Sequence, residues 1–72
     1  MILDVIRDIT ARKRAKHIYP DYALFIETYN RVGGDRKAFS AEVRELRDAG
    51  FITVGRTIND AYLKLNEDGY GI

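Results

Sequence analysis

The hydrophobic pattern of this chain changes abruptly at Gly50. Over residues 39–49 the apolar side chains recur at helical spacing, whereas Phe51-Ile52-Thr53-Val54 is a β-branched and aromatic run. Glycine readily takes the positive φ that ends a helix at its C′ position. The chain is therefore predicted to pass from an amphipathic helix directly into a strand.

The segment after Gly50 is predicted to be a β-hairpin. Ile58-Asn59-Asp60 has turn chemistry, and Ala61-Tyr62-Leu63-Lys64-Leu65 alternates as a half-buried strand does. An isolated hairpin is marginal in water, so this one is expected to lay its apolar face on helices. The acidic segment Asn66-Glu67-Asp68-Gly69 is expected to close the ordered part.

Two further helices are predicted upstream. Ile2, Val5, Ile6 and Ile9 recur at helical spacing and indicate a first helix over residues 2–16. Pro20 then interrupts the chain, with Asp21 expected to cap the free N–H groups of a second helix. That second helix is predicted over residues 22–32, where the apolar side chains at spacings of three and four are Tyr22, Phe25, Ile26, Tyr29 and Val32.

Turn and cap signals bound the third helix. Gly33-Gly34 is predicted to end the second helix, and Asp35 is predicted to cap the third, whose apolar stripe contains Phe39, Val43 and Leu46. The core is then expected to be drawn from all of these elements: Ile6, Ile9, Phe25, Ile26, Tyr29, Val43, Leu46, Ile52 and Leu63.

Length and composition limit the architecture to one small domain, expected to span residues 1–72. The chain contains 46% hydrophobic residues, which is enough for one small core. It contains no cysteine, so neither disulfides nor a thiolate metal site can supplement that core. No apolar run is long enough to span a bilayer, and the acidic start Met1-Ile2-Leu3-Asp4 is unlike a secretory signal. A soluble cytoplasmic protein, with no membrane association, is the expectation.

The second half of the chain resembles a known family. Leu46-Arg47-Asp48-Ala49-Gly50-Phe51-Ile52, followed by Tyr62-Leu63-Lys64-Leu65-Asn66-Glu67-Asp68-Gly69, resembles the segment from recognition helix to wing of bacterial winged helix-turn-helix regulators. Gly55-Arg56-Thr57-Ile58-Asn59-Asp60-Ala61-Tyr62 is also similar to the hairpin of small phage and mobile-element proteins. The resemblance implies an α+β fold, a three-helix bundle followed by a two-stranded wing, and a DNA-binding regulator.

The predicted third helix separates its charges. At about 100° per residue, its basic residues fall beside the apolar stripe, while Glu42, Glu45 and Asp48 fall on the other side. A recognition helix would present such a face to the major groove. The alternative is a solvated helix with mixed charges, since the net charge of the chain is only +1. The candidate face consists of Arg36, Lys37, Ser40, Arg44 and Arg47.

Two other basic groups are candidate phosphate contacts. Arg12, Lys13 and Arg14, near Lys16 and His17, are expected either to hold the DNA backbone or to compensate the dipole at a helix C-terminus. Arg56 and Lys64 extend the candidate footprint onto the wing. Their alternative role is that of ordinary outward-facing strand residues. Among the tyrosines, only Tyr70 is proposed to stack on bases.

Catalysis has little support in the sequence. His17 has no carboxylate at a fixed helical offset, and there is no cysteine nucleophile, glycine-rich phosphate loop or metal-ligand spacing. A non-enzyme without metal or cofactor is expected. Two functions remain open, a DNA-binding winged-helix protein and a protein-interaction module that docks a larger partner. Exposure of Leu24, Tyr70 or Ile72 would favour the second.

Overall fold

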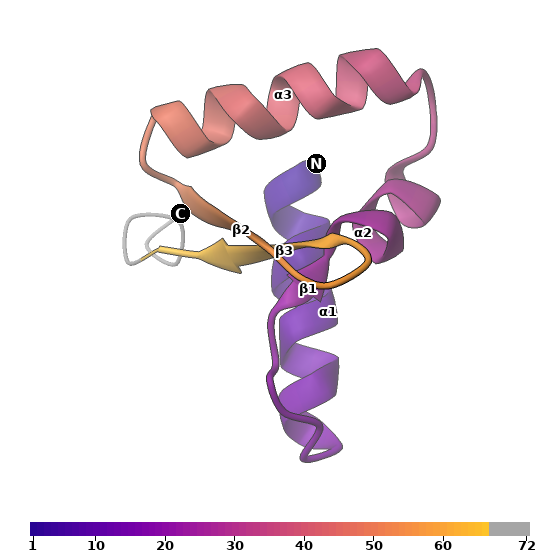
Figure 1. The fold of residues 1–72 in the computed structure, drawn as a ribbon. Helices are drawn as coiled ribbons and strands as arrows, with labels where there is room; N and C mark the ends of the chain where they lie inside the picture. Colours follow the sequence, from indigo (N-terminus) through magenta and orange to yellow (C-terminus); the bar gives the residue numbers. More distant parts are fainter. Residues whose placement is uncertain (67–72) are drawn as a thin grey trace.

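A computed structural model describes residues 1–66, which form three helices and a three-stranded antiparallel sheet (Figure 1). The expected acidic closing segment beyond Asn66, with Tyr70 and Ile72, lies outside the described residues. An α+β fold with a helical part and a hairpin is confirmed. Along the chain the elements are α1 (Ile2–Ala15), β1 (Ala23–Leu24), α2 (Phe25–Val32), α3 (Arg36–Asp48), β2 (Ile52–Arg56) and β3 (Ala61–Leu65).

The junction between α3 and the hairpin forms as the sequence predicts. Gly50 has φ +87°, the Gly50 N–H donates to the Arg47 carbonyl at 3.0 Å, and the Phe51 N–H donates to the Leu46 carbonyl at 3.0 Å. These two bonds form a Schellman motif and satisfy carbonyls that the helix end would leave open. The chain leaves α3 at this point and enters β2 two residues later.

The hairpin pairs β2 with β3 in one continuous register, from Ile52 opposite Leu65 to Arg56 opposite Ala61. The turn is closed at Thr57, whose N–H donates to the Asp60 carbonyl at 2.8 Å. The two strands therefore form the hairpin that the turn residues predict.

The start of the second helix differs from the prediction. Ala23 and Leu24 form β1, which pairs antiparallel with Leu63 and Tyr62 of β3, so the sheet order is β1-β3-β2. The helix begins only at Phe25, because backbone groups of the preceding residues are engaged by the sheet. Asp21 does not cap it; the Leu24 N–H donates instead to Oε1 of Glu27 at 3.0 Å.

The core lies between the helices and one face of the sheet. Ile26 is predicted to lie in the core, but it is 40% exposed. The buried face of α2 contains Phe25 and the side chains three and four positions after it, and Ile26 is rotated about 100° away from Phe25. Thr28 is fully buried there, its hydroxyl donating to the Leu24 carbonyl at 2.9 Å. Three expected core residues, Phe25, Tyr29 and Leu46, are only partly buried. The buried apolar residues are Ile2, Ile6, Ile9, Ala23, Phe39, Val43, Ile52, Leu63 and Leu65.

The helices give the molecule two distinct ends. In Figure 1, α3 lies across the N-terminal end of α1, and the C-terminal end of α1 extends away from α3. Phe39 of α3 anchors this arrangement, with its ring 5.0 Å from that of Phe25 and 5.2 Å from that of Tyr29. Surfaces on α3 and at the C-terminal end of α1 are therefore spatially separate.

Candidate nucleic-acid interface

The exposed side of α3 carries the predicted basic face. Asp35 fixes where the helix starts, because its carboxylate accepts the Ala38 N–H at 3.0 Å. Phe39 and Val43 are buried against the core, and this sets the rotation of the helix. As a result, the basic residues are exposed and Ser40 is half-buried. The exposed cations of α3 are Arg36, Lys37, Arg44 and Arg47.

Arg36 is held against aromatic rings. Its guanidinium carbon lies 5.8 Å from the ring centre of Phe25 and 5.8 Å from that of Tyr29. The Tyr29 hydroxyl in turn donates to the Gly34 carbonyl at 2.7 Å, which fixes that ring. Contacts of this kind attract a cation and restrict its side chain. Arg36 thus lies within cation–π distance of two aromatic rings.

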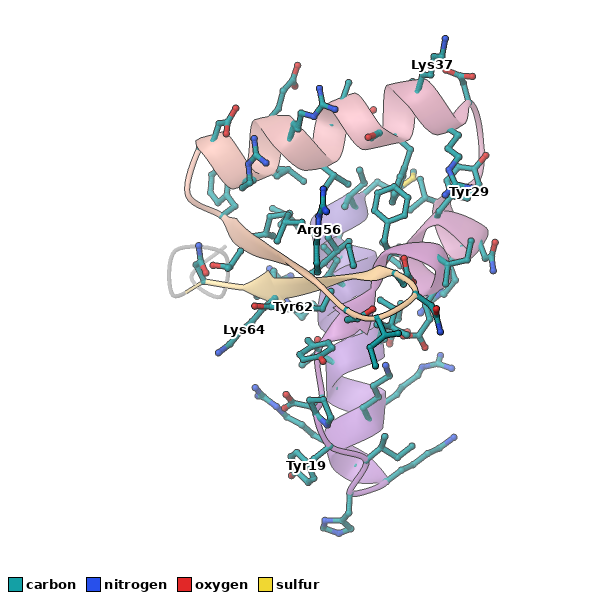
Figure 2. The ribbon with its side chains drawn as sticks, in the orientation of Figure 1. Tyr19, Tyr29, Lys37, Arg56, Tyr62 and Lys64 are labelled. Carbon is teal, nitrogen blue, oxygen red and sulfur yellow. The ribbon has the colours of Figure 1, made fainter. Side chains whose placement is uncertain are left out.

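The outward cations of the face differ in their partners. Arg47 forms an exposed pair with the adjacent Asp48, at 3.2 Å between Nη2 and Oδ1. Within residues 1–66, neither Lys37 nor Arg44 has a carboxylate within ion-pair distance. Figure 2 shows Lys37 extending away from the body of the molecule. Both charges are therefore available to an anionic partner.

An open hollow of about 710 Å³ lies where α3 begins. Phe25 contributes an apolar wall, and the remaining lining is Asp35, Arg36, Lys37 and Ser40. The hollow is continuous with the basic face through Arg36 and Lys37. It gives the N-terminal part of α3 a concave margin in which a polar group of a ligand can contact a cation and a hydroxyl.

The two hairpin cations lie on opposite faces of the sheet. Arg56 is paired with Ala61, on the face that contains Leu63, and Figure 2 shows its side chain extending toward α3. Lys64 lies on the other face and extends away from α3. The structure thus brings Arg56 to the same side as α3, but not Lys64.

The cations of α1 form ion pairs with carboxylates of the same chain. Nε of Arg12 lies 3.0 Å from Asp8, Nζ of Lys13 lies 2.7 Å from Glu27, and Arg14 pairs with Asp21. They lie at the end of the molecule remote from most of α3 (Figure 1). The structure does not bring Arg12, Lys13 and Arg14 together with the α3 face.

The pKa values of two of these carboxyl groups are lowered by their ion pairs. The hydrogen bond from Arg31 is the main cause that lowers the pKa of Asp8, with a further contribution from Arg12. The hydrogen bond from Arg14 similarly lowers the pKa of Asp21. Arg12 lies four residues from Asp8 on α1, a spacing visible in the sequence, whereas Arg31 pairs with Asp8 from α2 and Asp21 pairs with Arg14 from outside α1, so no local spacing predicts these two pairs.

Other kinds of site find no support in residues 1–66. No group of three or more histidine, aspartate or glutamate side chains is arranged to hold a metal ion there, and no helix in that range has the length and apolarity to cross a membrane. Leu24, whose exposure would favour a protein-interaction module, is half-buried. The chain matches no family model, no curated protein and no solved structure.

Proposed function

We propose that this chain is a DNA-binding protein of the winged-helix type, and that α3 enters the major groove of duplex DNA. The order of three helices followed by a hairpin is compatible with that layout. The observation that carries the proposal is the face of α3, where Lys37 and Arg44 are exposed and without a carboxylate partner in the described part of the chain. Such cations are suited to phosphates and base edges.

The proposed roles follow from the environment of each side chain. Arg36 lies against two aromatic rings, and this contact should reduce the side-chain entropy that it loses when it contacts a base edge. Lys37 and Arg44 are assigned to backbone phosphates, with Ser40 as a hydroxyl donor at the hollow. Arg56, which extends toward α3, is assigned to the DNA next to the helix.

A titration with DNA tests this proposal. A mixed-sequence duplex is added to the ¹⁵N-labelled protein at low and at high salt, and the amide shifts are followed. We expect shifts over residues 36–47 and near Arg56, and weaker binding at high salt because phosphate contacts release counterions. Arg44→Glu should reduce the affinity at least about tenfold, since one favourable contact becomes a repulsion.

Lys16→Glu provides a matched control. Lys16 is also exposed and without a carboxylate partner within residues 1–66, and the substitution changes the net charge by the same amount. It lies at the end of α1 remote from most of α3, so the affinity for DNA should change much less than in Arg44→Glu. Equal losses in the two variants would indicate a non-specific charge effect. Absence of shifts in the wild-type protein at low salt would overturn the DNA-binding proposal.

A further inference from the structure

A crevice of about 290 Å³ opens between α1 and α2, at the end of the molecule away from most of α3. Its apolar lining comes from Ile9, which is buried, and from Ile18, which is 48% exposed. The volume is just below the roughly 300–1,000 Å³ of typical small-molecule pockets, and the crevice is open to solvent. It therefore fits a single side chain better than a whole cofactor.

The position of Ile18 is fixed by the end of α1. The Ile18 N–H donates to the Lys13 carbonyl at 2.8 Å, and the His17 N–H donates to the Arg14 carbonyl at 3.1 Å. This is the same Schellman motif that ends α3, but here the residue with positive φ is His17, at +56°. The chain thus keeps a half-exposed isoleucine at the crevice by means of a backbone conformation that is unfavourable for a non-glycine residue.

The rim of the crevice is positively charged. Nearby carboxylates neutralise only part of this charge: Asp8 is shared by Arg12 and Arg31, and Glu27 accepts from Lys13. Lys16 has no carboxylate partner in the described chain. Four cations therefore face two carboxylates, and an excess of positive charge surrounds an apolar floor. The four are Arg12, Lys13, Lys16 and Arg31.

We propose that this crevice binds an acidic peptide segment of another protein, which inserts one apolar side chain between Ile9 and Ile18. The apolar floor offers nothing to a DNA backbone, which has no apolar side chain to insert, whereas the charged rim selects carboxylates. This surface goes beyond DNA binding and leaves the α3 face free for DNA.

Fluorescence anisotropy with a designed probe tests the proposal. The probe is a labelled peptide of aspartate and glutamate residues with a central leucine, and its controls carry a central serine or have every acid replaced by lysine. We expect the leucine peptide to bind, the serine peptide to bind about tenfold more weakly or worse, and the lysine peptide not to bind. Lys16→Glu and Ile18→Ser should each weaken binding of the leucine peptide, whereas Arg44→Glu should leave it unchanged.

Both crevice variants change exposed or half-exposed side chains, and a thermal melt and the dispersion of the amide spectrum verify that each remains folded. Equal binding of the serine and leucine peptides, or equal loss in Arg44→Glu and Lys16→Glu, would show general charge attraction and overturn the proposal. Loss of duplex DNA binding in Lys16→Glu with unchanged peptide binding would assign the surface to phosphates instead. Because the α3 face has its own variant, failure of either surface leaves the other testable.

Discussion

At the scale of single residues, the two long helices end by the same hydrogen-bond motif with different amino acids. Gly50 follows α3 with φ +87°, where it avoids the steric cost that a side chain meets in this region. His17 follows α1 with φ +56°, where its Cβ meets the steric cost of the left-handed region. The sequence predicts the first end, because glycine there coincides with a change of periodicity. The sequence also predicts that the first helix ends near residue 16, but it does not predict the positive φ of His17, because no glycine marks that position.

Gly50→Val should destabilise the protein although it adds apolar surface. A Cβ at this position has no atom within 4 Å, so the cost comes from the backbone conformation and not from a clash. That cost is about 1–2 kcal/mol. In a domain of this size, each kcal/mol lowers Tm by roughly 4–8 °C. Ala49→Val is the control, since Ala49 has ordinary helical φ. Equal Tm values for the two variants would contradict the explanation.

At the scale of elements, long periodic segments were predictable and short non-local ones were not. The hydrophobic period identifies α1 and α3, and turn residues identify the hairpin. The strand β1 was not predicted, because it has only two residues and forms through the pairing of Ala23 with Leu63, forty positions later. Its apolar residues also fit a helical period, so the sequence favoured an earlier start of α2 and an inward-facing Ile26.

In the candidate site, too, local features could be predicted from the sequence and contacts between distant segments could not. Rotation along one helix is a local property, so the alignment of Arg36, Lys37, Arg44 and Arg47 could be predicted, and their exposure agrees with it. The pairing of Arg14 with Asp21 joins α1 to the segment before β1, and this depends on the fold. A basic sequence cluster therefore does not reveal which of its charges are already neutralised.

The pair between Arg14 and Asp21 should make stability depend on pH. The pKa of Asp21 is lowered in the folded protein by the Arg14 hydrogen bond, and Lys64 contributes. Its stabilisation is therefore present above the unfolded pKa, near 3.8, and is lost as pH falls through the folded pKa. Asp21→Asn should lower Tm at pH 7, and its difference from the wild type should shrink toward pH 2. Arg14→Gln should show the same convergence; a constant difference across this range would argue against the pair.

At the scale of the whole molecule, one small core supports two surfaces at different ends. Phe39 connects the α3 face to the fold, because its ring contacts Phe25 and Tyr29 of α2 while its backbone belongs to α3. The same two rings hold Arg36. Loss of the Phe39 ring should therefore disturb the packing of α3 on α2. The basic face would then be disordered although none of its charges has been changed.

Phe39→Ala should strongly destabilise the protein. Phe39 is only 3% exposed, and truncating a buried phenylalanine costs about 3–5 kcal/mol through lost burial and the cavity left behind. A chain of this size is stabilised by only about 4–11 kcal/mol in total, so a large part of the stability would be lost. Urea unfolding followed by circular dichroism measures the change.

Ile58→Ala is the control, because Ile58 is 98% exposed and its truncation should change the free energy of unfolding by less than about 0.5 kcal/mol. Similar midpoints for both variants would mean that Phe39 does not anchor α3 and that the support inferred for the basic face is wrong.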